Sequence, residues 1–223
     1  MKAHAMPVVL SSARQRGTTL IGLMIGLFIS MIVVLATMML FQRTGRAIGD
    51  ARRDAQADAQ RSAAFLAAEM ALQEAGYGIP AAQAGTHLVV LTGAKLTNTT
   101  LTGTPAVVGA TGTAVVWAEN TMGTMRCSGL LASNGNEPAG LRKLGPATCT
   151  NASNFAAVAW PSQTLSNIPV TISWRADSCS SFGIAPVSGA GTGTQKVLLT
   201  LSSANSNGVP LQTSQCLNNI SSP

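Results

Sequence analysis

Side chains that could carry catalysis are scarce in the C-terminal two thirds of the chain. After residue 80 there are three acids, Glu119, Glu137 and Asp177, and one histidine, His87. General acid–base or nucleophilic chemistry needs such groups to converge, and nothing in their spacing indicates that they do. Gly-x-Ser-x-Gly and phosphate-loop motifs are also missing from the sequence. We therefore expect no enzyme activity and no cofactor.

The four cysteines favour disulfides over a metal site. Cys127, Cys149, Cys179 and Cys216 form no Cys-x-x-Cys pair, and His87 is the only histidine near them in sequence. Because zinc sites need clustered ligands, we expect no metal. An even number of cysteines indicates two disulfides formed in an oxidising compartment. Of the three possible pairings we predict Cys127–Cys149 and Cys179–Cys216, because partners near in sequence close the smaller loops.

The rest of the chain follows a long apolar run without charged residues. The run covers residues 18–41. A helix of roughly 20 apolar residues crosses the hydrocarbon core of a bilayer, which is about 30 Å thick. We predict a transmembrane helix over residues 18–41, preceded by a cytoplasmic leader over residues 1–17.

The charges beside this run orient it weakly. Lys2, Arg14 and Arg16 precede it with no acid among them, which favours a cytoplasmic N-terminus, but Arg43 and Arg46 follow it. The cysteines agree with the N-in orientation, because all four come after the run. A cleaved secretory signal is disfavoured, since its apolar core would be about 7–15 residues long and would end at a small-x-small site.

The order of residues at the start of the run is distinctive: Arg16-Gly17-Thr18-Thr19-Leu20-Ile21-Gly22-Leu23-Met24. It resembles the class III signal of type IV prepilins and type II secretion pseudopilins. The resemblance implies that a prepilin peptidase cleaves after Gly17 and methylates the new N-terminus at Thr18. Thr18 stands where Phe or Met is usual in the family. An ordinary signal anchor with the same residues is the alternative.

Gly22 is the main departure from this family, because most members carry Glu there. In the family that Glu meets the N-terminal amine of the preceding subunit within the apolar filament core. A subunit without it suits the filament tip, where no predecessor exists; the alternative is that Gly22 is a tolerated variant. Gly22 and Gly26 also form a small-x-x-x-small pair, which lets two membrane helices approach closely.

The helix is predicted to continue beyond the membrane. Residues 42–75 contain no proline and consist mostly of good helix formers. Apolar residues recur there at steps of three and four and predict a stripe that packs on the following domain: Ile48, Ala51, Ala55, Ala59, Ala63, Leu66 and Met70. Gly76, Gly78 and Pro80 are expected to end the helix, which places its periplasmic extension at residues 42–79.

The last residues of this predicted helix show a second resemblance. Phe65-Leu66-Ala67-Ala68-Glu69-Met70 and Gln73-Glu74-Ala75-Gly76-Tyr77-Gly78 are similar to the end of the long helix in PilW-type minor pilins. The resemblance implies a bitopic protein of the bacterial inner membrane with a periplasmic domain, later carried into a pilus at the cell surface. It implies as partners the prepilin peptidase, other minor and major pilins and the inner-membrane assembly platform.

Other functions on the same anchor stay open. A type II secretion minor pseudopilin has the same leader and helix, and an adhesion or DNA-uptake module would use the β domain to bind a ligand. That domain has six cations and three acids, an excess of +3 without a cluster. Its charge alone therefore does not support DNA or a surface ligand as a partner.

Residues 80–223 are predicted to form a β-rich globular domain with two disulfides. Runs that favour β-strands occur at residues 87–92, 113–118, 155–160, 170–174 and 196–201. We predict an α+β fold, in which a long N-terminal transmembrane helix packs on a C-terminal antiparallel sheet. Trp117, Trp160 and Trp174 lie in these runs and are expected to pack in or beside the core.

Overall fold

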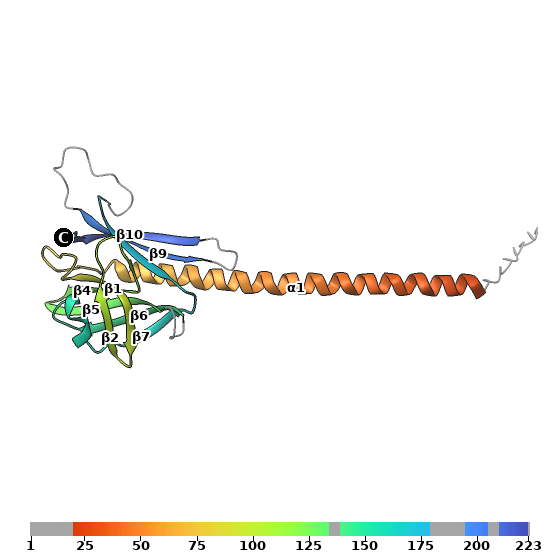
Figure 1. Cartoon of the computed structure of the whole chain (residues 1–223), viewed down its shortest axis with the longest axis horizontal. Helices are drawn as coiled ribbons and strands as arrows, with labels where there is room; N and C mark the ends of the chain where they lie inside the picture. Colours follow the sequence, from red (N-terminus) through yellow and green to blue (C-terminus); the bar gives the residue numbers. More distant parts are fainter. Residues whose placement is uncertain (1–19, 134–138, 179–194, 205–209, 223) are drawn as a thin grey trace, which may run out of the picture. The chain divides into compact units, whose positions relative to one another are not determined.

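The structure, a computed structural model, describes residues 20–133, 139–178, 195–204 and 210–222. The chain forms two compact units, Met1–Ala51 and Arg52–Pro223. Helix α1 (Leu20–Leu72) begins in the first unit and ends in the second (Figure 1). The helix ends at Leu72, three residues before the end of the predicted helix-forming segment 42–75, because residues 73–78 form turns. The N-terminal leader, including the predicted cleavage site at Gly17 and Thr18, lies outside the described residues.

The second unit contains two antiparallel sheets among the described residues. The first has six strands in the order β2-β1-β4-β5-β6-β7, and the second has four in the order β10-β9-β8-β3 (Figure 1). The strands of the first sheet are β1 (Leu88–Thr97), β2 (Thr100–Pro105), β4 (Ala114–Thr121), β5 (Thr124–Ser133), β6 (Gly140–Thr148) and β7 (Ser162–Ser166). Those of the second are β3 (Thr111–Gly112), β8 (Thr171–Asp177), β9 (Lys196–Ala204) and β10 (Pro210–Ser221). The predicted α+β class, with an apolar N-terminal helix and an antiparallel β domain, is confirmed.

The β4–β5 hairpin shows how local sequence sets strand register. Thr121 lies opposite Thr124, so the connection has two residues, Met122 and Gly123. Both have positive φ, 54° and 81°, which is the type I′ geometry that matches the twist of antiparallel strands. The tight turn therefore fixes the register that places Trp117 opposite Ser128 further along the hairpin.

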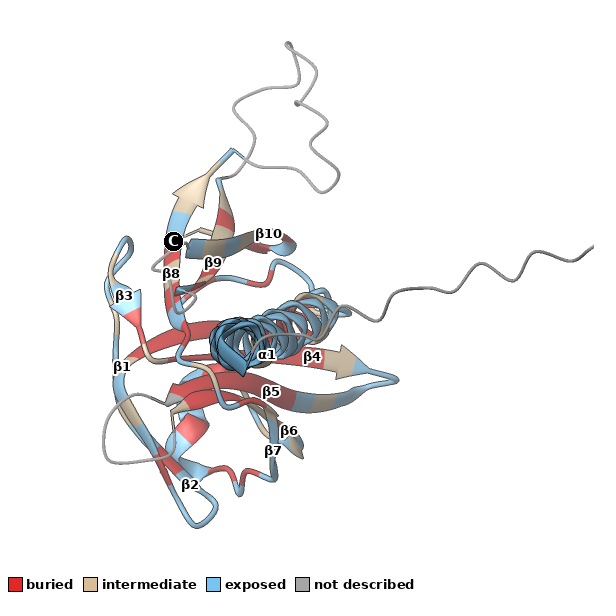
Figure 2. Ribbon diagram, turned by 90° about the vertical axis from the view of Figure 1, so that its right-hand side faces the viewer, coloured by how far each residue is buried: buried red, intermediate tan, exposed pale blue. Residues whose placement is uncertain are grey.

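The last part of α1 lies between the two sheets (Figure 2). Phe65, Ala68 and Leu72 are buried in one core cluster with Trp117 of the six-stranded sheet and Leu199 of the four-stranded sheet. Burial of apolar surface is the dominant favourable term in folding, so this shared cluster holds the three layers together. The sequence predicts one sheet against the helix, whereas the described residues place a sheet on each side.

The predicted apolar stripe of α1 is wrong. All seven of its residues are exposed, and the fractional exposure of Leu66 and Met70 is 59% and 62%. The buried face instead carries Arg61, Ala64, Phe65, Ala68, Ala71 and Leu72. The buried face therefore combines three alanines with the larger side chains of Arg61, Phe65 and Leu72.

One predicted strand is also wrong. Residues 155–160 contain the end of a 3₁₀ helix, η1 (Ala152–Ala157), rather than a strand. The Asn151 side chain accepts a hydrogen bond from the Asn154 backbone N–H at 3.0 Å and caps this helix. Trp160 Nε1 donates to the Phe155 carbonyl at 2.8 Å and closes the segment.

The remaining predicted runs are confirmed as parts of β1, β4, β8 and β9. The described residues also form β2, β3, β5, β6, β7 and β10, which were not predicted from the sequence. All three tryptophans are buried, as expected, with exposures of 0% for Trp117, 1% for Trp160 and 7% for Trp174. Trp160 belongs to a second core, which covers the other face of the six-stranded sheet beneath η1.

Candidate functional site

The apolar part of α1 exposes its entire surface. Every residue from Leu20 to Ile48 is exposed, and the most apolar 18-residue window has a mean hydropathy of 2.7 with none of it buried. Such a surface is unfavourable in water. By length and composition the helix can cross a membrane.

Small and hydroxylated residues follow one line along this helix. Gly22 and Gly26 are exposed, and a Cβ atom added at Gly26 would meet nothing within 4 Å. Ser30, one further step of four, extends the pair and was not predicted from the sequence. Residues four apart lie on one helix face, so the chain presents an open, narrow surface where a second helix can approach closely.

The hydroxyl groups of this helix are satisfied within it. Ser30 Oγ donates to the Leu27 carbonyl, Thr37 Oγ1 to the Val34 carbonyl and Thr44 Oγ1 to the Leu40 carbonyl, each at 2.9 Å. A hydroxyl without a partner is costly in an apolar environment. These bonds therefore allow the three residues to face lipid or another helix without an external hydrogen-bond partner.

The end of α1 is fixed to the six-stranded sheet by backbone hydrogen bonds. Gly76 N–H donates to the Ala118 carbonyl at 2.9 Å, and Asn120 N–H donates to the Tyr77 carbonyl at 2.8 Å. Gly78 lies so close that an added Cβ would be 2.1 Å from the Asn120 carbonyl oxygen. The sequence predicts these glycines as helix terminators, but the contact with β4 could not be read from it.

The opposite side of the helix end is fixed to the four-stranded sheet. Thr213 Oγ1 donates to Glu69 Oε1, and Asn219 Nδ2 donates to the Ala75 carbonyl at 3.3 Å. The last turns of α1 are therefore held by polar contacts on both sides, in addition to the shared apolar core.

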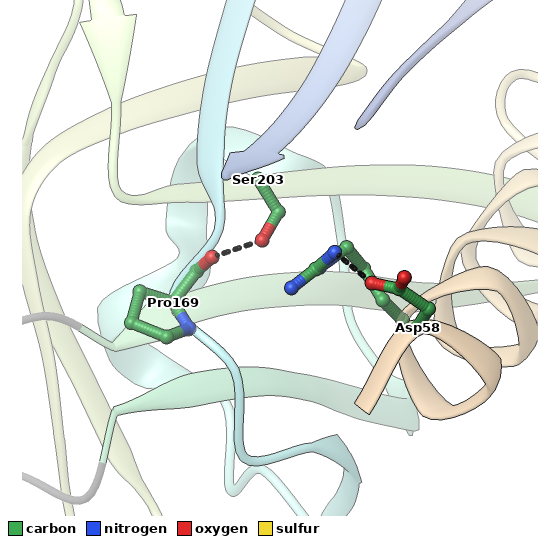
Figure 3. A network of polar contacts seen from close by, with 4 residues as sticks. Asp58, Pro169 and Ser203 are labelled. Atoms are coloured by element: carbon green, nitrogen blue, oxygen red, sulfur yellow. Dashed lines mark hydrogen bonds and ion pairs between the residues drawn. The ribbon is translucent and has the colours of Figure 1, made fainter. Parts of the chain in front are cut away.

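The same helix contains a buried cation, Arg61, further towards its N-terminus. Arg61 has a side-chain exposure of 5%, and its Nη1 donates to Asp58 Oδ1 at 2.7 Å (Figure 3). Its Nε is buried and has no hydrogen-bond partner among the described residues. Nearby, Ser203 Oγ donates to the Pro169 carbonyl at 2.7 Å (Figure 3). The ion pair with Asp58 therefore provides the main compensation for burying the guanidinium.

Glu119 is a buried acid whose surroundings perturb its carboxyl group. It lies on β4 with 8% exposure. Burial is the largest cause that raises the pKa of its carboxyl group, followed by the charge of Glu74, while Arg126 and Lys143 act in the opposite direction. The net direction is upward because burial disfavours the charged form.

The disulfide between Cys127 and Cys149 is present as predicted. The Cα atoms are 5.7 Å apart, and the bridge ties β5 to the segment after β6. Cys216 is disulfide-bonded as well. Cys179, the partner predicted for it, lies outside the described residues.

The side chains considered for catalysis have local roles. His87 Nδ1 accepts from the Gln83 N–H at 3.2 Å, and Asp177 is paired with Arg175 at 2.9 Å. Glu137 lies outside the described residues. Within residues 20–133, 139–178, 195–204 and 210–222 no three His, Cys, Asp or Glu side chains form a group that could hold a metal ion.

The functional candidate is a surface: an exposed apolar helix with a line of small residues, whose last part lies between two sheets. No protein-family model matches this chain, and no curated protein or solved structure matches it significantly.

Proposed function

We propose that this protein is a PilW-like minor type IV pilin. It is made as a prepilin, held in the bacterial inner membrane with its N-terminus in the cytoplasm, and processed after Gly17. Its β domain faces the periplasm, and the protein primes or joins the assembly of a pilus with other minor and major pilins. Its work is helix packing and docking on the assembly platform rather than substrate turnover.

The order of residues from Arg16 to Met24, at the start of the exposed apolar helix, carries this proposal. A prepilin needs a cleavage signal and an apolar helix free to pack against other subunits. In this chain Gly22 and Gly26 leave such a helix open to close approach. The antiparallel β domain around the helix end supplies the folded part that the proposal requires.

Processing is the first test. Intact-mass analysis of the membrane form should show a chain that begins at N-methyl-Thr18. Gly17→Val should leave the full-length precursor, because the larger side chain obstructs a peptidase cleft shaped for glycine. Gly26→Val, the same change beyond the cleavage site, is the control and should be processed normally. A mature chain that still begins at Met1 would remove the proposal.

The position of the subunit in the filament is the second test. Without an acid at Gly22 the subunit has no carboxylate to pair with the amine of a predecessor, so we place it at the tip. An unpaired carboxylate in the apolar core would cost several kcal/mol. Gly22→Glu should therefore not increase piliation, and labelled protein should appear in few copies at filament ends. Labels along the shaft, or a clear gain in pili from Gly22→Glu, would refute the tip position.

Two alternatives keep the same anchor and are separated by phenotype. If the protein is a type II secretion minor pseudopilin, its deletion should abolish protein secretion and leave pili intact. If it is an adhesion or DNA-uptake module, its deletion should leave the number of pili unchanged and abolish binding of the ligand. DNA binding through phosphates would in addition weaken steeply with added salt.

A further inference from the structure

Two cations lie on α1 directly beyond the end of its apolar run at Phe41. They are Arg43 and Arg46, and both are exposed. Residues 18–49 contain no acid, so this part of the chain carries positive charge only. Cations on this flank weaken the charge bias that orients the run, and helix packing in a filament gives them no role. Their position therefore calls for a partner of its own.

The place of these arginines along the helix sets their depth in a membrane. Helix α1 is continuous from Leu20 to Leu72 (Figure 1). A helix rises by about 1.5 Å per residue, so Arg43 and Arg46 lie about 3 Å and about 7.5 Å beyond Phe41 along the helix axis. The headgroup layer on each side of the hydrocarbon core is about 5–7 Å thick. With the apolar run in the membrane, both arginines therefore lie at the level of the headgroups.

The arginines and the line of small residues lie on different faces of the helix. Arg43 and Arg46 are three residues apart and share one face. At about 100° per residue, the midpoint of this pair lies about 130° around the helix axis from the line of Gly22, Gly26 and Ser30. A second helix can therefore pack on the small residues while both arginines stay in contact with lipid.

The chemistry of the pair fits anionic lipid headgroups. A guanidinium group presents a planar fork of N–H donors, which binds two phosphate oxygens at once. In a zwitterionic headgroup the phosphate is already offset by the cation of the same lipid, whereas in an anionic headgroup it is not. Each cation near an anionic surface strengthens binding about fivefold, so two cations that share one lipid should strengthen it about 30-fold.

We propose that Arg43 and Arg46 form a binding site for the phosphate groups of anionic lipids in the periplasmic leaflet. The bound lipid holds the helix at a fixed depth while the subunit stays in the membrane. The inference rests on one part of the proposed function, the insertion of residues 18–41 in a membrane with the N-terminus in the cytoplasm. It depends neither on cleavage after Gly17 nor on pilus assembly.

Photo-crosslinking measures the lipids beside this site. The full chain carries p-benzoylphenylalanine in place of Phe41, whose side chain is 83% exposed. It is reconstituted in nanodiscs with equal amounts of phosphatidylglycerol and phosphatidylcholine, and mass spectrometry identifies the crosslinked lipid. Phosphatidylglycerol should be favoured by about fivefold if one arginine holds the lipid and by about 30-fold if both do.

Two variants and a second reporter position provide the controls. Arg43→Gln together with Arg46→Gln should reduce the ratio at residue 41 to about one, since the charges that select the anionic lipid are gone. Arg43→Lys together with Arg46→Lys keeps both charges and should keep the preference. The same reporter at Leu20, which is 79% exposed at the other end of the described helix, should give a lipid ratio that neither variant changes.

Equal crosslinking of the two lipids at residue 41 would overturn this inference, and so would a preference that survives the glutamine variant. A chain that alkaline carbonate releases from membranes would refute the proposed membrane anchor as well. Acidic side chains of other subunits are the competing partners of the two arginines. In that case the glutamine variant would reduce piliation although the lipid ratio is about one in both chains, and the lipid site would be refuted.

Discussion

Replacing Gly78 by alanine tests whether the end of α1 is held against β4 as the structure shows. Gly78 has a φ of +67°, and an added Cβ would lie 2.1 Å from the Asn120 carbonyl oxygen. Cβ atoms essentially never come within 3.0 Å of such an atom, so the helix end or β4 must move. The Asn120 N–H also donates to the Tyr77 carbonyl at 2.8 Å, and a movement would lengthen this bond.

Gly93→Ala is the matched control for this substitution. Gly93 has a φ of +60°, close to that of Gly78, but its added Cβ would meet nothing within 4 Å. In the control, placing alanine in the left-handed region therefore lowers the free energy of unfolding by about 1–2 kcal/mol. Gly78→Ala lowers the free energy of unfolding by the same amount and in addition causes a collision with the backbone. Overpacking typically lowers this free energy by a further amount of about 1–3 kcal/mol. We expect a total loss of about 2–5 kcal/mol in the free energy of unfolding at Gly78.

Urea unfolding of the full chain in detergent micelles measures this difference. The fluorescence of Trp117, which is fully buried in the core around α1, reports the unfolding of the β domain. Hydrogen exchange provides a local measurement: the Asn120 amide should exchange faster in Gly78→Ala and at an unchanged rate in Gly93→Ala. Equal losses in the two variants would show that the helix end is not held against Asn120, and would refute the reasoning.

Three further predictions concern the stability of the β domain. Replacing Cys127 and Cys149 together by serine should lower the free energy of unfolding by about 3 kcal/mol, since the bridge joins residues with a sequence separation of 22; an unchanged urea midpoint would contradict this. Asp58→Ala should lower the urea midpoint more than Arg61→Met does, because it alone leaves a buried guanidinium unpaired; the reverse order would contradict it. Burial raises the pKa of Glu119 above its ordinary value of 4.5, so the folded chain binds the proton more tightly than the unfolded chain. The protein therefore loses stability as the pH rises from the pKa of this group in the unfolded chain to its higher pKa in the folded chain. Glu119→Gln should therefore stabilise the protein at neutral pH and make little difference below about pH 4, and a gain that does not change with pH would contradict this origin.

Much of the fold could be predicted because its determinants are local. The apolar run in α1 needs only its own composition, and β1, β4, β8 and β9 occur where β-favouring residues are dense. Residues 155–160 have the same β-favouring composition but lie in and after η1, because the Asn151 side chain caps a helical turn there. Side-chain capping of this kind competes with strand propensity and is visible in the sequence only as one asparagine.

A pocket in the β domain could not have been predicted for a different reason. Most of its residues are ordinary aliphatic and small side chains, which in a sequence are typical of core or turn. Only the pairing of β3 with β8 brings Trp174 beside residues 105–108. Among the described residues the buried indole N–H groups of Trp117 and Trp174 have no acceptor, whereas that of Trp160 has one, so the pairing of an indole also depends on its surroundings.

The error in the helix stripe shows what apolar periodicity does and does not report. Both faces of α1 carry apolar residues at steps of three and four, so periodicity alone cannot say which face packs inside the chain. The face that packs between the sheets is the one with Phe65, Ala68 and Leu72, whereas Leu66 and Met70 are exposed. Exposed apolar residues in line are costly for a chain that stays alone in water. For a subunit that packs beside other helices, as we propose here, the same residues provide the outer contact surface, and the buried face around Phe65 and Leu72 provides the inner one.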